Sequence, residues 1–165
     1  YTLSLNNNLS QLGVTAPNDN RDMAYSGSLL WMPTTGEFGP RGGFGDLEYH
    51  TRVATRFGVS AGHAREGRYA PLDQAPNETQ SRRSDGVSPF ELGARAEGIP
   101  VRTLDYDLLA ADAGVKYRGF SFQAEYYARR LSRFAATGRL PMTPIFDQGF
   151  MAQAMYMFVA RLAGS

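Results

Sequence analysis

Five basic residues in this chain have the chemistry and the spacing to act together on an anion. They are Arg52, Arg56, Lys116, Arg118 and Arg129. A guanidinium group holds phosphate or carboxylate through two parallel hydrogen bonds, and a row of such groups favours anions over cations. The alternative is that these cations pair with acids and water and keep the structure rigid. Either interpretation requires that one face of the fold gathers them.

Other candidate sites have a weaker basis. His50 stands near Glu48, but neither this pair nor His63 has a third metal ligand at a useful spacing. A second candidate, for a divalent cation, is a set of three carboxylates. Its members are Asp105, Asp107 and Asp112. Such spaced acids at a strand end are usually just solvated, and no serine sits in a nucleophile motif. We therefore expect no enzyme activity, no metal and no cofactor.

Composition narrows the class of protein. The chain has 165 residues, a formal net charge of +1, 42% hydrophobic residues, 18 glycines and no cysteine. A near-neutral charge gives no indication of a nucleic-acid partner, and without cysteine there is no disulfide or thiolate metal site. The longest apolar run, Ala154 to Ala160, is too short for a membrane-spanning helix. Abundant glycine and aromatic residues are typical of many-stranded all-β proteins.

Alternation of apolar and polar residues with period two predicts the positions of the strands. We expect strands at about 1–6, 23–33, 51–64, 105–117, 120–131 and 149–160. Long loops rich in Pro, Gly, Asn and Ser separate some of them, near 6–22, 65–104 and 132–148. The glycine-rich segment from 33 to 49 lacks a following helix and is interpreted as an irregular turn. Loops of such length usually carry function.

The sequence "YRGF" closes a two-residue hairpin and fixes the register of its strands. Tyr117 then lies opposite Phe120, and the apolar positions are odd before the turn and even after it. The further apolar pairs expected are Val115–Phe122, Ala113–Ala124 and Ala111–Tyr126. On the opposite face this register places Asp112 beside Glu125, an unfavourable pair unless Arg56 or Arg129 intervenes.

The twenty-five positions assigned to the apolar face of five of these strands contain no charged residue. A soluble antiparallel β-sandwich would also segregate charge in this way. Two features favour a wall in contact with lipid: alanine and glycine alternate with aromatic residues, and isoleucine is scarce. The aromatics expected at the short-turn ends are Trp31, Tyr117, Phe120 and Phe158. We therefore predict an antiparallel transmembrane β-barrel, with Arg52, Arg56 and Lys116 facing a watery lumen.

Three segments of the chain also resemble a known family. They are "WMPTTGEFGPRGGFGDLEYHTRVATRFGVS" from residue 31, "DAGVKYRGFSFQAEYYARRL" from residue 112 and "DQGFMAQAMYMFV" from residue 147. This pattern is similar to the interior of the phosphate-selective porin O and P family. The resemblance implies a barrel of about sixteen strands in the bacterial outer membrane, commonly trimeric, in contact with membrane lipids and passing small anions, phosphate among them.

The resemblance further implies that residues 1–165 are an internal part of a single barrel domain. We expect a signal peptide upstream and a final aromatic strand downstream. On this interpretation the chain lines a passive, anion-preferring diffusion channel.

Two other functions remain open. One is a soluble or surface-exposed β-sandwich that binds a ligand, for example a carbohydrate, through Trp31, Tyr126 and Tyr127. The other is a lipid hydrolase housed in a barrel, which needs a serine, an acid and either His50 or His63 to converge near one rim. Solubility without detergent would favour the first alternative, and lipid turnover would favour the second.

Overall fold

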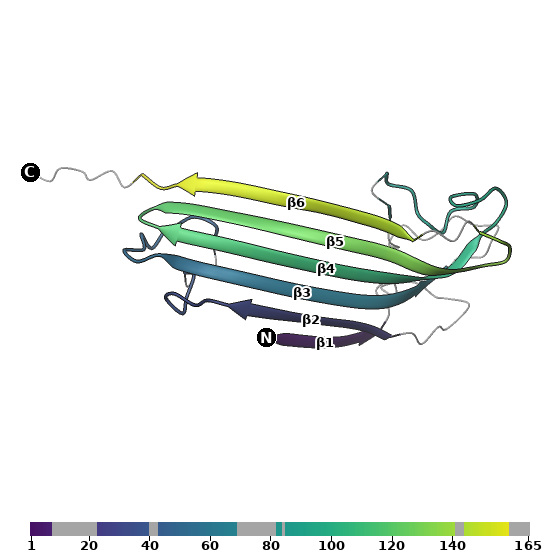
Figure 1. Ribbon diagram of the computed structural model, residues 1–165, viewed down its shortest axis with the longest axis horizontal. Coiled ribbons are helices and arrows are strands. Elements are labelled where there is room, and N and C mark those ends of the chain that lie inside the picture. The colour runs from purple at the N-terminus through teal and green to yellow at the C-terminus, as the bar shows by residue number, and fades with distance from the viewer. Residues whose placement is uncertain (8–22, 40–42, 69–81, 84, 141–143, 159–165) are drawn as a thin grey trace, which may run out of the picture.

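The computed structural model of the chain describes residues 1–7, 23–39, 43–68, 82–83, 85–140 and 144–158 (Figure 1). Its strands are β1 (Thr2–Asn7), β2 (Met23–Trp31), β3 (Ala54–Gly67), β4 (Val101–Tyr117), β5 (Phe120–Ala136) and β6 (Ile145–Tyr156). They form one sheet in which every strand pairs antiparallel with the next. Among the residues that the structure places, no helix is long and apolar enough to cross a membrane.

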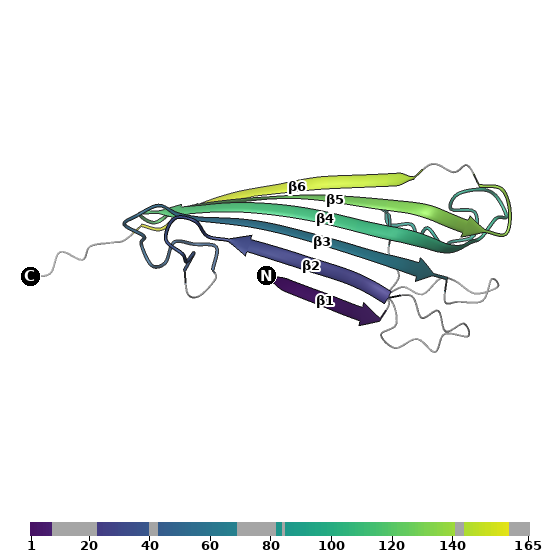
Figure 2. The same ribbon diagram turned by 60° about the horizontal axis from the view of Figure 1, so that its bottom comes forward.

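The sheet confirms the all-β, antiparallel class, but it is not closed. β1 and β6 lie at opposite margins of the sheet (Figures 1 and 2), and among the described strands each of them pairs on one side only. The chain therefore forms an open six-stranded meander. The predicted wall of about sixteen strands would need further strands, from other residues or other chains.

Strands run further than predicted at the end of the sheet where the long loops lie. β5 continues to Ala136 and β6 begins at Ile145, so the predicted loop over 132–148 shrinks to 137–144. The predicted loop over 65–104 likewise shrinks to 68–100. Alternation misses these strand ends because inward-facing positions there are apolar and pack against a loop. Most of the predicted loop over 6–22 lies outside the described residues.

The β4–β5 hairpin forms as predicted. Arg118 and Gly119 both have positive φ, 47° and 83°, as the two central residues of a type I′ turn require. Tyr117 pairs with Phe120, and Asp112 pairs with Glu125. The expected pairs Val115–Phe122, Ala113–Ala124 and Ala111–Tyr126 are all present. A single tight turn is enough to set this register, since a one-residue shift would move every side chain to the other face.

The two faces of the sheet differ in what covers them. We call the outer face the one that carries Phe57, Val115 and Phe122, and the inner face the opposite one. Large apolar side chains of the outer face stay exposed: Phe57 is 43% exposed, Val59 44% and Phe122 38%. The outer face is therefore an apolar surface without a second layer over it in the described structure.

A loop covers the inner face at one end of the sheet. Phe90, fully buried, comes from the long connection between β3 and β4 and packs against strand residues of β4 and β5. The whole cluster consists of Phe90, Val101, Leu104, Leu131, Phe134 and Leu140. Burying Phe90 and its neighbours removes apolar area from water and stabilises this end of the sheet. The hydrophobic core of the described chain thus lies at a strand end, not along the strands.

A second connection covers the inner face at the opposite end. We call residues 33–53, between β2 and β3, the cap segment. Its Phe38 ring lies over Gly114 so closely that a Cβ atom there would be 2.6 Å from a ring carbon. Gly45 of the same segment lies against Met155 of β6, since a Cβ atom added at Gly45 would be 2.9 Å from the Met155 sulfur. The segment interpreted as an irregular turn therefore folds back onto the sheet, and only the middle of the inner face is uncovered.

Candidate functional site

The uncovered middle of the inner face carries two ion pairs. From β3, Arg56 places Nη2 3.2 Å from Oδ1 of Asp112 on β4. Asp112 also stands opposite Glu125, so Arg56 is the base that relieves the predicted clash between these two acids. Arg56 and Asp112 are about a third and a fifth exposed, at 32% and 22%. The pair is thus in contact with water and can be reached by a solute.

Arg129 of β5 makes the second ion pair. Its Nη2 and Nε donate to the same oxygen of Asp147 on β6, at 2.6 Å and 3.1 Å. The register accounts for the contact, because Arg129 and Asp147 are directly opposed. Of the five predicted cations, the two on the open inner face are Arg56 and Arg129, and carboxylates of neighbouring strands hold both.

Small residues of β3 leave room for the Arg56–Asp112 pair on the inner face. Gly58 lies opposite Asp112, and a Cβ atom at Gly58 would overlap the Asp112 carboxylate. Further along the same face of β3 come Ser60 and Gly62. Glycine at position 58 lets the Asp112 side chain lie flat across the neighbouring strand, toward Arg56. The inner face of β3 therefore carries little side-chain bulk beside the Arg56–Asp112 pair.

Lys116 faces inward as predicted, but its predicted exposure to water is wrong. It is fully buried, at 0% exposure. Its Nζ donates to the carbonyl oxygen of Gly43 at 2.8 Å and lies 4.7 Å from the centre of the Phe38 ring. The cap segment thus encloses the ammonium group with a carbonyl and an aromatic face. Lys116 anchors this segment and is not available to a passing anion.

Arg52 and Arg118 lie at the end of the sheet. Arg52 is exposed and precedes β3, which begins at Ala54 and not at residue 51 as predicted. Arg118 is exposed in the hairpin turn, with its guanidinium 5.1 Å from the centre of the Tyr117 ring. The structure therefore does not gather the five predicted cations into one row. Arg56 and Arg129 remain on the open face, and the other three lie at the capped end.

A cluster of ionisable groups fastens the cap segment to the hairpin. Asp46 accepts hydrogen bonds from the amides of Gly119, at 2.7 Å, and His50. The His50 ring contacts Asp46 through Nδ1 and Glu37 through Nε2, the latter at 3.0 Å. The amide of Arg118 donates to the carbonyl of His50 at 2.8 Å. The hairpin turn and the cap segment are thus held together by buried polar contacts.

These contacts shift the pKa values of two groups in opposite directions. Burial alone would raise the pKa of Asp46, but the hydrogen bonds from His50 and Gly119 outweigh it and hold that pKa below its ordinary value. Burial alone would lower the pKa of His50, but Asp46 and Glu37 outweigh it and raise that pKa. The two carboxylates thus stabilise the protonated form of the imidazole relative to the neutral form.

The same cluster supplies the third metal ligand that sequence reasoning missed. Ligand atoms of Asp46, Glu48 and His50 lie within 4.8 Å of one another. Both ring nitrogens of His50 and both carboxylate oxygens of Asp46 already make the contacts described above. The amino group of Lys116 lies beside Gly39, next to the Glu48 carboxylate. The hydrogen bonds account for the arrangement without a cation.

The carboxylates suggested for a divalent cation do not meet. Asp105 and Asp107 lie on the outer face, since they pair with Ser132 and Arg130, whereas Asp112 lies on the inner face. Asp105 and Asp107 have odd numbers and Asp112 has an even one, so the alternation of side chains along a strand already places them on opposite faces.

His63 is on the outer face too, with Nδ1 2.7 Å from Asp107. Within the described part of the chain no serine is hydrogen-bonded to His63 or His50, so neither histidine forms a hydrolytic triad there.

Sequence reasoning missed two arginines of the inner face. Arg82 and Arg83, from the long connection between β3 and β4, line a hollow of about 550 Å³ together with Arg129 and Asp147. Arg83 pairs with Asp85, and Arg82 donates to the carbonyl of Gly86 at 3.0 Å. The adjacent arginines are visible in the sequence, but only the folded loop brings them to Arg129.

Comparisons of this chain with family models, with curated proteins and with solved structures found no match. The resemblance to the phosphate-selective porins therefore remains a prediction made from the residues.

Proposed function

We propose that this sheet is part of the wall of an outer-membrane pore, with lipid against its outer face and water against its inner face. The observation that carries the proposal is the pair of unlike faces. Large apolar side chains such as Phe57 and Phe122 stay exposed on the outer face, while the chain's own loops fold onto the inner face. A soluble protein would place its loops and core against the apolar face, because that removes most apolar area from water.

The dimensions of the apolar band support this location. On β4 the outer positions are free of charge from Leu109 to Tyr117, and on β5 from Phe120 to Ala128. At about 3.3 Å per residue and a tilt of roughly 40°, such a stretch covers about 20 Å of membrane depth, close to the band of membrane barrels. Exposed aromatic residues lie at its hairpin end, with Phe120 at 40% and Tyr156 at 52% exposure. These are the positions that an aromatic girdle occupies. Trp31, which was expected there, lies level with Ala113 in the middle of the band.

The open edges imply a larger assembly. Unpaired backbone groups of β1 and β6 would be costly in hydrocarbon, so further strands must pair with both. A closed barrel of about sixteen strands, associated as a trimer, would meet this requirement. The resemblance to the phosphate-selective porin family supports that choice of size and assembly.

Charge on the uncovered inner face is net negative on the strands, and the loop arginines bring it to balance. Arg56 and Arg129 stand against Asp112, Glu125 and Asp147, which is two cations against three anions. Adding Arg82, Arg83 and Asp85, which pairs with Arg83, makes four cations against four anions. We therefore expect Arg82 and Arg83 to oppose the cation preference that the strand carboxylates alone would impose, with Arg56 and Arg129 mainly organising the wall.

Reversal potentials across planar bilayers in a salt gradient test this assignment on the complete protein. We expect Arg82→Gln combined with Arg83→Gln to shift the ion preference toward cations, because the local balance becomes negative. Arg139→Gln is the matched control, since Arg139 is exposed in the connection between β5 and β6. An unchanged ion preference in the double variant would remove these arginines from the mechanism.

Detergent dependence separates the pore from the soluble sandwich. A membrane wall requires detergent or lipid to stay in solution, whereas a sandwich would cover the outer face with another layer of its own chain. A complete protein that is monodisperse in buffer without detergent would overturn the membrane location.

A further inference from the structure

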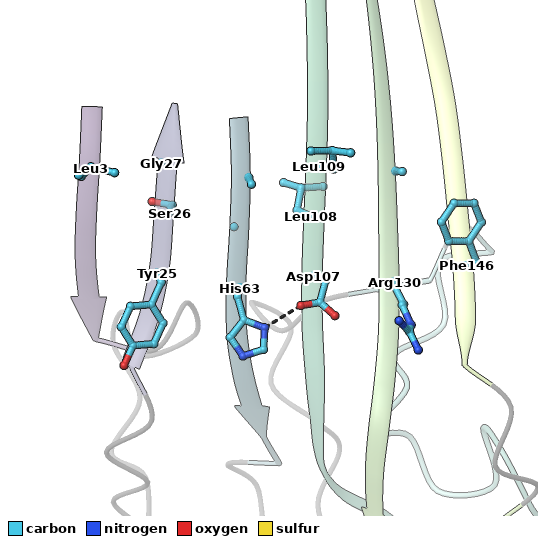
Figure 3. A pocket seen from close by; sticks show the side chains of 13 residues that line it. Leu3, Tyr25, Ser26, Gly27, His63, Asp107, Leu108, Leu109, Arg130 and Phe146 are labelled. Atoms are coloured by element: carbon cyan, nitrogen blue, oxygen red, sulfur yellow. Dashed lines mark hydrogen bonds and ion pairs between the residues drawn. The ribbon is translucent and has the colours of Figure 1, made fainter. Parts of the chain in front are cut away.

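A row of polar and aromatic residues ends the apolar band on the outer face. Tyr25, His63, Asp107, Arg130 and Phe146 are opposite one another in the register of β2 to β6. Figure 3 shows Tyr25, His63, Asp107 and Arg130 side by side across four neighbouring strands. The row crosses the sheet at the end away from the β4–β5 hairpin. It marks the level at which the outer face changes from apolar to charged.

A shallow hollow of about 650 Å³ lies along this row. Its apolar side is lined by Leu3, Leu109 and Ala128, and its polar side by His63 and Arg130 (Figure 3). The apolar lining is open to the surroundings, since Leu3 is 82% and Leu109 49% exposed. A ligand that fits must therefore combine an apolar body with a polar or charged end.

The charged side of the hollow is set up for an anion. Asp107 is engaged by His63, with 2.7 Å between its oxygen and Nδ1. Arg130 is exposed and makes no hydrogen bond or ion pair with any residue that the structure describes. Its guanidinium offers donors in a planar fork that matches phosphate.

The neighbouring residues on the side of the long loops add net positive charge to the row. Asp105, which is 1% exposed, contacts both Arg65 and Arg133. The rim thus contains three arginines, Arg65, Arg130 and Arg133, against the two aspartates Asp105 and Asp107, a surplus of one positive charge before His63 is counted. This balance complements an anionic head group.

We propose that this hollow binds a membrane lipid with an anionic phosphomonoester head group, with its acyl chains along Leu3 and Leu109 and its phosphate on Arg130 beside His63. The inference rests on the proposed membrane location of the outer face. A free phosphate ion would use only the charged side and leave the apolar side exposed, so a lipid fits the whole surface better. Such a lipid would also hold the barrel at a defined depth, because the row lies where hydrocarbon gives way to head groups.

Native mass spectrometry of the complete protein in nonionic detergent tests the proposal. The two probes are phosphatidic acid and phosphatidylcholine with the same acyl chains, so that they differ in the head group alone. We expect the protein to retain phosphatidic acid about tenfold better, as one additional charge-assisted hydrogen-bonded contact predicts. Equal retention of the two lipids would overturn the proposal, whatever the behaviour of any variant.

Variants of Arg130 test whether this row causes the preference for phosphatidic acid. Arg130→Gln should reduce retention of phosphatidic acid to the level of phosphatidylcholine, and Arg130→Lys should restore part of it. Arg52→Gln makes the same change of charge at the opposite end of the sheet and should leave retention unchanged. Retention by Arg130→Gln equal to that of the unmodified protein would overturn the site.

Two further measurements separate the possible failures. Inorganic phosphate added in excess should not displace the lipid, and displacement would show that the site is one for free phosphate. The reversal potential of the same preparation reports on the pore itself. A protein that conducts ions but retains no phosphatidic acid refutes the lipid site alone, whereas a protein soluble without detergent refutes the membrane location as well.

Discussion

The two faces of this sheet are built on the same strands and yet obey different rules. On the outer face, side chains from Leu109 to Tyr117 are uncharged and none of them is buried, and no described segment packs on them. On the inner face, glycine, serine and charged residues alternate, and the chain's own loops cover both ends. From this difference we infer that the outer face is suited to an apolar surrounding and the inner face to water.

The sharpest way to break this comparison is to put the same charge on each face at neighbouring positions. Ala111 is an exposed outer residue, and Ala110 is a half-buried inner residue. We expect Ala111→Arg to lower the free energy of unfolding in lipid vesicles by about 2–4 kcal/mol, because the guanidinium would lie in hydrocarbon. Ala110→Arg should cost much less, since it faces water. Similar losses for both variants would contradict the assignment of the faces.

The next largest loss of stability is expected when the hydrogen bonds that attach the cap segment to the hairpin are removed. Asp46→Ala would leave the buried amides of Gly119 and His50 without their acceptor, at a cost of about 1–3 kcal/mol. Hydrogen exchange at these amides should become faster while exchange in β4 stays slow. Glu97→Ala is the control, because Glu97 is exposed in the connection between β3 and β4, away from the cap segment. Uniform exchange across both variants would show that Asp46 does not hold this end.

A smaller loss of stability is expected when a side chain is added at Gly58 on the inner face. Gly58→Ala would push against the Asp112 carboxylate and separate it from Arg56, at a cost of about 1 kcal/mol in unfolding free energy. Gly62→Ala on the same face of β3 should be nearly neutral, because the nearest atoms to its Cβ are 3.8 Å away or more. Urea unfolding of the two variants in the same lipid measures the difference. Equal midpoints would contradict the close approach at Gly58.

The smallest effect is the pH dependence of the cap segment. The lowered pKa of Asp46 stabilises the fold above its ordinary value of 3.8, and this is lost as the pH falls through the folded pKa. The raised pKa of His50 stabilises the fold below 6.5, and this is lost as the pH rises through the folded pKa. The cap segment should therefore be held best between about pH 4 and 6.5.

Limited proteolysis of the cap segment measures this dependence. Cleavage between residues 33 and 53 should be faster at alkaline pH than near pH 6. His50→Gln should remove the dependence, and His63→Gln should keep it, because His63 lies on the outer face away from the cap segment. A pH dependence that survives His50→Gln would assign it to another group.

Much of the sheet was predictable because it depends on local rules. Period-two alternation located the strands, and the "YRGF" turn set the register that pairs Asp112 with Glu125. The same parity separates Asp107 from Asp112. Strand ends were predicted less well, since Leu104 and Leu131 pack against a loop and so break the alternation that marks an inward-facing strand.

The candidate site was predicted only in part. Arg56 and Arg129 were placed correctly on the inner face, and Arg56 was named as one of two bases that could separate the acids. Neither the burial of Lys116 nor the approach of Arg82 and Arg83 could be predicted. Both depend on where a long connection folds, and no local pattern in such a segment encodes the strand it will meet.

The sequence by itself determined which side chains share a face, because alternation and one tight turn leave the backbone a single register. Only the tertiary structure decided which charges meet water. Lys116 and Arg56 share the inner face of neighbouring strands, yet the cap segment buries the one and leaves the other open. Burial depends on contacts between residues far apart in the chain, and these form only once the connections have folded back onto the sheet.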